Sequence, residues 1–164
     1  MAPTKIKFRS DGSYREQLIK NEEPDSWIDI RIRVGEEYIY GGPDSYVTGF
    51  ACGFVLNLLD SVSAMKTGER SIIELEYGPT WLTIDPVDQT AVRIAACRTY
   101  KGAMDSSERL EIDDDAVVSK EAWESEVLRT AREFHETVVD VNPDLQDQEV
   151  IADIRDRIDS FSEE

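Results

Sequence analysis

Three consecutive carboxylates are the most conspicuous residues that could do chemistry in this chain. Asp113, Asp114 and Asp115 lie beside an apolar run in the stretch EIDDDAVV. A calcium loop of the EF-hand type needs oxygen ligands at its first, third and fifth positions and glycine at its sixth. Counted from Asp113, the fifth and sixth positions are Val117 and Val118, so the pattern fails at the turn. We therefore predict no metal site and interpret the run as solvated acid before a helix N-terminus, where negative charge is favourable.

Histidine chemistry and phosphate binding find equally little support. His135 is the only histidine, and its stretch HETVV lacks the second histidine of the zinc-protease motif HExxH. We interpret it as a histidine on a helix face without a functional role. The stretch YGGPDS has the glycines of a phosphate-binding loop but places Asp44 where the anion would lie, so we interpret Asp44 or Ser45 as a helix cap. The sequence therefore predicts no catalytic residue and no cofactor, and it favours binding over catalysis.

The two cysteines, Cys52 and Cys97, lie in apolar surroundings and lack the CxxC spacing of redox and metal motifs. We interpret them as reduced, buried thiols rather than a disulfide or a metal pair, as is typical of cytosolic proteins. The segment 1–12 has no apolar core of a secretory signal. The longest apolar run, 50–59, is too short to span a bilayer. We therefore predict a cytoplasmic protein that does not enter a membrane.

The charge of the chain restricts its partners. A length of 164 residues with 40% hydrophobic residues predicts one globular domain with a real core. The 35 Asp and Glu outnumber the 18 Lys and Arg, which gives a net charge of −17. Such a field repels phosphate backbones and anionic lipid surfaces. We therefore expect neither nucleic acid nor a membrane as a partner, and an unidentified protein remains.

The acidic residues are spread along the whole chain, and Arg is preferred over Lys among the cations. This composition resembles that of cytosolic proteins from halophilic archaea. The resemblance implies that dense carboxylates keep the surface hydrated in concentrated salt, where electrostatic screening lengths shrink to a few ångströms. It covers composition alone and implies no functional residue.

Hydrophobic periodicity predicts the elements that must position any site. WIDIRIRV alternates apolar and polar residues, which is typical of a half-buried strand. Helical spacing of apolar residues and cap signals predict a central helix, 45–66, and a long C-terminal helix that Ser119 caps, with Val118 and Trp123 in contact across the cap. The other expected elements are strands at 37–40, 73–77, 81–85 and 91–99, short strands at 5–8 and 108–112, a polar loop at 101–108, and a last helix at 147–160.

This order predicts a single α+β domain, 1–164, with an antiparallel sheet of about five to six strands and helices packed on it. The order is strand-strand-helix, three strands with a further short one, then helix-helix. The domain divides into a polar N-terminal segment, 1–26, a sheet region, 27–112, with the inserted helix 45–66, and a C-terminal helical pair, 119–161. The element order over about 27–141 resembles profilin and roadblock-like scaffolds, and implies no functional residue. Small toxin-immunity proteins are similar in size, acidity and fold class.

Two surfaces are candidates for recognition. Gly49 and Gly53 lie four residues apart on the predicted central helix, which has a wide apolar arc that includes Phe50 and Leu56. Small residues at this spacing let helices approach closely, which motivates a homodimer hypothesis. The second candidate is the face of the sheet opposite its apolar side, where cross-strand ion pairs are the simpler interpretation and a docking face is the functional one. Its predicted residues are Arg31, Arg33, Glu74, Glu76, Trp81, Thr83 and Arg93.

The sequence thus favours a non-catalytic protein-interaction or regulatory domain adapted to high salt. Two alternatives from other classes stay open. One is a metal-dependent hydrolase that uses scattered carboxylates, and the other is an immunity-type inhibitor whose acidic face binds a basic nuclease.

Overall fold

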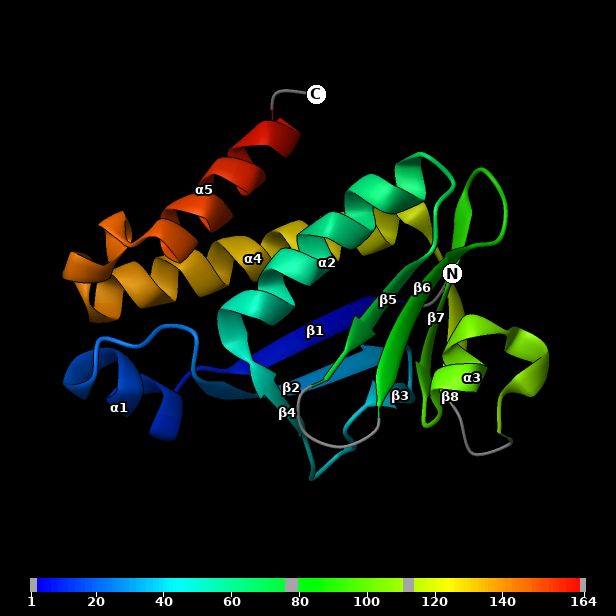
Figure 1. Ribbon diagram of the computed structural model, residues 1–164, viewed down its shortest axis with the longest axis horizontal. Helices are drawn as coiled ribbons and strands as arrows, with labels where there is room; N and C mark the ends of the chain where they lie inside the picture. Colours follow the sequence, from blue (N-terminus) through cyan, green and yellow to red (C-terminus); the bar gives the residue numbers. More distant parts are fainter. Residues whose placement is uncertain (1–2, 76–79, 111–113, 163–164) are drawn as a thin grey trace.

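The computed structural model describes residues 3–75, 80–110 and 114–162 and has an α+β architecture (Figure 1). Its strands form two four-stranded sheets, in which every pairing is antiparallel. The first sheet contains β1 (Thr4–Arg9), β2 (Trp27–Val34), β3 (Glu37–Tyr40) and β4 (Val47–Phe50), and the second contains β5 (Ser71–Glu74), β6 (Trp81–Pro86), β7 (Ala91–Cys97) and β8 (Asp114–Ser119). The helices are α1 (Ser13–Lys20), α2 (Ala51–Lys66), α3 (Tyr100–Met104), α4 (Lys120–Val141) and α5 (Glu149–Ser162), with short 3-10 helices at Ser106–Glu108 and Pro143–Asp147. The predicted fold class is confirmed.

The two sheets differ in topology. The second sheet has the simple order β5-β6-β7-β8. In the first, β2 pairs with β1 along one edge and with both β3 and β4 along the other. β4 covers Trp27 to Ile30 of β2, and β3 covers Ile32 to Val34. The long β2 is therefore paired along both edges, which satisfies its backbone groups.

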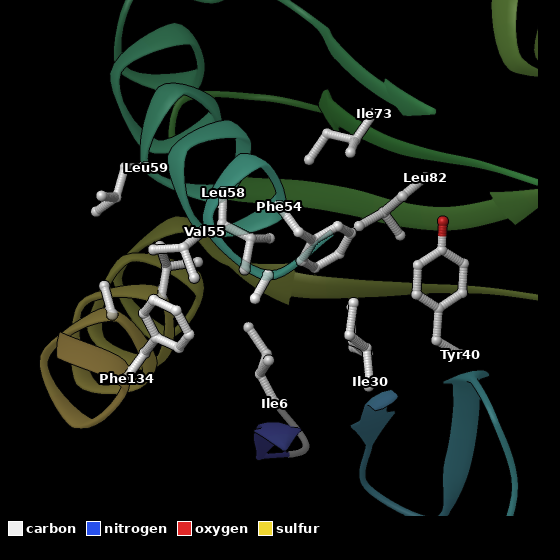
Figure 2. Packing of buried hydrophobic residues seen from close by; sticks show 14 of the residues in the cluster. Ile6, Ile30, Tyr40, Phe54, Val55, Leu58, Leu59, Ile73, Leu82 and Phe134 are labelled. Carbon is white, nitrogen blue, oxygen red and sulfur yellow. The ribbon is translucent and has the colours of Figure 1, made fainter. Parts of the chain in front are cut away.

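The core lies between the sheets and the two long helices. α2 and α4 lie across the sheets, and α5 packs on them from the far side (Figure 1). Alternation in β2 buries Ile28, Ile30, Ile32 and Val34 and turns Asp29, Arg31 and Arg33 outward, as predicted. Figure 2 shows the ring of Phe54 from α2 among side chains of both sheets. One apolar cluster thus joins the two sheets to the helices.

The central helix begins later than predicted. The sequence suggested 45–66, whereas α2 starts at Ala51 because residues 47–50 pair with β2 as β4. Gly49 and Phe50 therefore belong to a strand. The described strands also divide between two sheets instead of forming one, and α2 is the connection from β4 of the first sheet to β5 of the second.

Several other boundaries also differ from the predictions. The polar N-terminal segment 1–26 contains β1 and α1, and the predicted loop 101–108 contains α3 and a 3-10 turn. Of the predicted strands 73–77 and 108–112, residues 76 and 77 and residues 111 and 112 lie outside the described residues. The cap of α4 is confirmed, because the Ser119 hydroxyl accepts a hydrogen bond from the Ala122 N–H at 3.0 Å. Val118 and Trp123 are both fully buried beside it. None of the helices within the described ranges combines the length and the apolar character that crossing a membrane requires.

The N-terminus of α2 is capped by a residue from a distant part of the sequence. The Oδ1 atom of Asp25 accepts hydrogen bonds from the N–H groups of Cys52 at 2.9 Å and Gly53 at 3.1 Å. Phe50, the residue at the cap position, provides no side-chain hydrogen bond. Asp25 therefore satisfies two N–H groups that the helix itself leaves without partners.

We expect Asp25→Ala to lower the free energy of unfolding by about 1–2 kcal/mol, the usual cost of losing an N-terminal cap. Asp44→Ala is the matched control, because the exposed Asp44 was the sequence-based candidate for this cap and lies before β4. Its effect should stay within about 0.5 kcal/mol, as for most surface substitutions. Urea unfolding at constant salt, followed by far-UV circular dichroism, measures both variants. Equal losses for the two would contradict the assignment of the cap.

Candidate interaction surface

The outer face of the first sheet gathers cationic side chains. The register of β1 and β2 places Lys5 opposite Arg33, Lys7 opposite Arg31, and Arg9 opposite Asp29. Residues directly opposite in an antiparallel pair share a face, and this one points away from the buried isoleucines of β2. We call the surface formed by Lys5, Lys7, Arg9, Arg31, Arg33, Tyr38 and Tyr46 the cationic face. Asp29 is the only carboxylate that β1 and β2 contribute to it.

Two tyrosines hold the arginines in place. The guanidinium carbon of Arg31 lies 4.7 Å from the centre of the Tyr46 ring and 5.9 Å from that of Tyr38. Arg9 lies 5.8 Å from the Tyr46 ring, and Arg33 lies 6.0 Å from the Tyr38 ring. Each such cation–π contact contributes about 0.5–1 kcal/mol at an exposed site. The guanidinium groups and the rings thus alternate along the sheet.

The loop between β3 and β4 orients the central arginine further. Nη1 of Arg31 donates hydrogen bonds to the carbonyl oxygens of Gly42 at 3.3 Å and Pro43 at 3.2 Å. A guanidinium carries five N–H donors, so these two contacts leave others available. Because the side chain is already ordered, less conformational entropy is lost when it binds a partner.

Most cations of the cationic face form no salt bridge with the described carboxylates, although Lys5 and Lys7 line the same hollow as Glu126 and Glu133. Many cations elsewhere pair with carboxylates, as in Lys66–Glu124 at 2.8 Å and Arg70–Asp85 at 3.3 Å. Others are scattered singly and bind uncharged oxygens, as Arg132 binds the Ser162 hydroxyl. In the described part of the chain, no carboxylate forms a salt bridge with Lys5, Lys7, Arg31 or Arg33. Arg9 alone makes long contacts, to Asp11 at 3.6 Å and Asp29 at 3.8 Å. Within the part of the chain that the structure describes, a protein of net charge −17 therefore keeps four cations without a carboxylate partner on one surface.

An aromatic pair lies at one end of the same face. Trp27 is 45% exposed, and its ring stacks on that of Phe50 with the centroids 4.2 Å apart. Beside it is a cavity of about 380 Å³, whose lining includes Arg9, Ser13, Trp27 and Thr48. Exposed Trp and Arg side chains next to a pocket are typical anchors of protein interfaces.

The predicted interaction residues are divided between the two sheets. Arg31 and Arg33 lie on the cationic face, and Glu76 lies outside the described residues. The others are in the second sheet, with Glu74 on β5, Trp81 and Thr83 on β6, and Arg93 on β7. The structure therefore splits the set into two groups, with Arg31 and Arg33 on the first sheet and the other four described members on one side of the second, where Glu74 lies opposite Trp81.

The members in the second sheet have partners within the fold. Thr83 is fully buried, and its hydroxyl accepts a hydrogen bond from Arg109 at 3.2 Å, so it is not part of an exposed face. The Trp81 ring packs edge-on against Tyr100 of α3, and Arg93 pairs with Asp115 across the sheet at 3.2 Å. Arg93 thus takes part in a cross-strand ion pair, which was the simpler interpretation of this set of residues.

Sequence reasoning missed five members of the cationic face, namely Lys5, Lys7, Arg9, Tyr38 and Tyr46. A signal for three of them was present, because KIKFR and IRIR both place cations at every second position. Alternation puts such residues on one side of a strand. The pairing of β1 with β2, however, could not be derived from either pattern alone.

The glycines proposed for a dimer helix do not lie on one helix. Gly49 pairs with Ile28 within the first sheet, and Gly53 is in the first turn of α2, where its N–H is bound to Asp25. Phe50 stacks on Trp27, and Leu56 is partly buried against the core. Their spacing marks the junction between β4 and α2. The homodimer hypothesis stays a prediction, and these four residues do not define the surface through which two copies would meet.

Potential metal ligands are scattered in the described residues, and both cysteines are free and buried. Nowhere in 3–75, 80–110 and 114–162 do three His, Cys, Asp or Glu side chains cluster in a way that could hold a metal ion. Asp113 of the carboxylate run lies outside these residues, and Asp114 and Asp115 lie in β8. Burial raises the pKa of the Cys52 thiol well above its usual value, with the negative charges of Asp25 and Glu23 adding to the shift. A thiol held protonated in this way is a weak nucleophile.

His135 provides a prediction about pH. Burial, followed by the positive charge of Arg155, lowers its pKa, and its buried Nε2 atom has no hydrogen-bond partner among the described residues. The carboxylates of Asp159 and Glu136 act in the opposite direction. The unfolded chain, in which the histidine pKa is about 6.5, therefore binds the proton more tightly than the folded protein does.

It follows that the free energy of unfolding should decrease as the pH falls below about 6.5, and that His135→Gln should reduce this decrease. Urea unfolding of both proteins at about pH 7.5 and about pH 5.5 measures the effect, because carboxylates titrate mainly below this window. An identical decrease in the variant would show that His135 does not contribute.

Comparison of the chain with protein-family models, with curated proteins and with solved structures found no match. The functional proposal therefore depends on the geometry of the chain itself.

Proposed function

We propose that this chain is a non-catalytic protein-interaction domain and that the cationic face is its docking surface. The observation that supports this proposal is that four cations on one sheet face have no carboxylate partner among the described residues, in a chain of net charge −17. The protein carries many acidic residues elsewhere, and a few substitutions near the cationic face would place carboxylates beside these cations. Complementary charge from a partner supplies the missing neutralisation and selects that partner over others.

The setting we propose is a salt-rich cytoplasm. Two observations support it: acidic residues are spread over the whole chain, and both cysteines are free and buried. Salt screens charges that are separated by more than a Debye length, about 3 Å at 1 M. Docking under such conditions relies on direct contacts, and the ordered arginines and the exposed Trp27 are suited to these.

Charge reversal on the cationic face should abolish partner capture. We expect the double variant Arg31→Glu, Arg33→Glu to capture at least about tenfold less of the main partner than the wild type, because two attractive contacts become repulsive. The experiment compares proteins captured from native extract by the tagged wild type and by the variant at one salt concentration. Circular dichroism of each purified protein verifies that it is folded.

The matched control is Arg132→Glu, Arg155→Glu. It changes the net charge by the same amount, and its two positions lie on α4 and α5, away from the cationic face. Arg132 contacts Ser162, and Arg155 contacts Asp156, so neither has a buried partner to lose. The control should retain the partner of the wild type. The proposal fails if the Arg31, Arg33 variant captures the same partner equally well, or if both double variants lose it to the same extent.

A further inference from the structure

The partner that the cationic face would take can be specified by its chemistry. Resting on the proposed function, we infer that the face binds an extended acidic segment of a protein, in which carboxylates alternate with other residues. The inference follows from the spacing of the cations, from the contacts of the tyrosine rings and from the charge of the rest of the molecule.

The cations form two rows with the spacing of an extended chain. Arg31 and Arg33 are alternate residues of one strand, as are Lys5 and Lys7 on the neighbouring strand. Alternate residues of a strand lie about 6.5–7 Å apart on the same face. Side chains at every second position of an extended peptide repeat at the same interval. A segment with Glu or Asp at alternate positions can therefore place successive carboxylates against successive cations.

The guanidinium group favours carboxylate as the ligand. Its N–H donors form a planar fork that matches the two oxygens of a carboxylate, which gives short, charge-assisted hydrogen bonds. Arg31 is already oriented by the carbonyl groups of Gly42 and Pro43. The guanidinium groups of Arg31 and Arg33 also both contact the ring of Tyr38. The donors are therefore pre-positioned before any partner arrives.

A single-stranded nucleic acid fits the same surface less well. Proteins that bind single strands offer aromatic rings on which bases stack. Here the rings of Tyr38 and Tyr46 are engaged by three guanidinium groups. A phosphate backbone long enough to extend past the cationic face would also meet the field of a molecule with net charge −17. An acidic peptide segment needs no free ring for stacking, and a segment no longer than the cationic face limits the repulsion to its ends.

The test uses four labelled probes and fluorescence anisotropy. They are a peptide of alternating Glu and Thr, a peptide of equal composition with Glu and Thr in separate blocks, a peptide of alternating Gln and Thr, and an oligothymidylate of similar contour length. Each is titrated with the wild type, with the Arg31→Glu, Arg33→Glu variant and with the Arg132→Glu, Arg155→Glu control. The buffer contains the lowest KCl concentration at which circular dichroism shows all three proteins folded.

We expect the alternating Glu peptide to bind the wild type and the control equally, and the Arg31, Arg33 variant at least about tenfold more weakly. The block peptide should bind more weakly than the alternating one, and the Gln peptide should not bind. Amide shifts in the nitrogen–proton NMR spectrum of the wild type should move mainly in β1 and β2.

Three results would overturn the inference. One is tighter binding of oligothymidylate than of the alternating Glu peptide, with the same dependence on Arg31 and Arg33. The second is equal affinity for the alternating and block peptides, because net charge alone would then decide binding. The third is no binding of the Glu peptides by the wild type. None of these contradicts the docking surface itself. That proposal fails if capture of the natural partner is insensitive to charge reversal at Arg31 and Arg33, or is lost equally in the Arg132, Arg155 control.

Discussion

Replacing Trp123 with alanine is expected to lower the free energy of unfolding by about 3–5 kcal/mol, the range for removing a large aromatic side chain from a core. Native domains are stable by only about 5–15 kcal/mol, so this loss is a large part of the total. Trp123 is fully buried in the first turns of α4. Its removal leaves a cavity where α4 meets α2.

A hydrogen bond adds to the packing of this side chain. The indole N–H of Trp123 donates to the Ser61 hydroxyl of α2 at 3.1 Å, and that hydroxyl donates to the Leu58 carbonyl at 2.6 Å. Ser61 is fully buried, so the bond is shielded from water. The side chain therefore fixes both the distance between the two long helices and their register.

Two further variants separate packing from hydrogen bonding. Trp123→Phe retains much of the apolar volume and loses the N–H, and Ser61→Ala removes the acceptor. Each should cost less than the alanine variant, with about 0.5–1.5 kcal/mol attributable to the bond in a double-mutant cycle. Urea unfolding at constant salt measures the wild type, the three single variants and the Trp123→Phe, Ser61→Ala double variant. If Trp123→Ala does not fold, the phenylalanine variant still tests the contact. A loss below about 1 kcal/mol for the alanine variant would be inconsistent with a buried Trp123.

Phe54→Ala is expected to have an effect of similar size, about 3–5 kcal/mol, for a different reason. Phe54 lies in α2 where both sheets approach the helix (Figure 2). Its ring centroid is 5.9 Å from that of Phe8 on β1 and 6.3 Å from that of Tyr40 on β3. On the side of the second sheet, Figure 2 shows Ile73 and Leu82 beside it. Removing the ring thus loosens the contact of both sheets with the helix.

Leu56→Ala is the matched control on the same helix. Leu56 is only partly buried against the core, whereas Phe54 is 3% exposed. The control should lose clearly less stability than Phe54→Ala, because less apolar area is removed from contact. Urea unfolding compares the two variants, through both the free energy of unfolding in water and its dependence on urea concentration. Equal losses would contradict the central position of Phe54.

The local patterns of the sequence predicted most elements of this fold. The alternation in WIDIRIRV predicted β2 to the residue, and the cap at Ser119 predicted the start of α4. Both signals are local, because each depends on residues a few positions apart. Local patterns are less informative where a distant partner decides the conformation. Residues 47–50 continue the apolar character of the helix that follows them, and they form β4 because β2 offers them backbone hydrogen bonds.

The candidate site shows the same division. Alternation alone placed Arg31 and Arg33 on the polar side of a strand, and the structure agrees. Alternation did not reveal that Thr83 is buried. Its contacts with Arg109 and α3 come from residues outside β6, which the spacing of that strand does not show. It also left out Lys5, Lys7 and Arg9, which belong to a segment that composition described only as polar.

The sequence by itself determined the charge of the molecule, the periodicity of its main strands and helices, and the chemical character of its thiols and carboxylates. The tertiary structure alone decided which residues meet. Strand pairing unites Lys5 to Arg9 with Asp29 to Arg33, and the β3–β4 segment brings Tyr38 and Tyr46 beside them. The physical reason is that backbone hydrogen bonds and apolar burial between distant segments set the register, and the register assembles the cationic face.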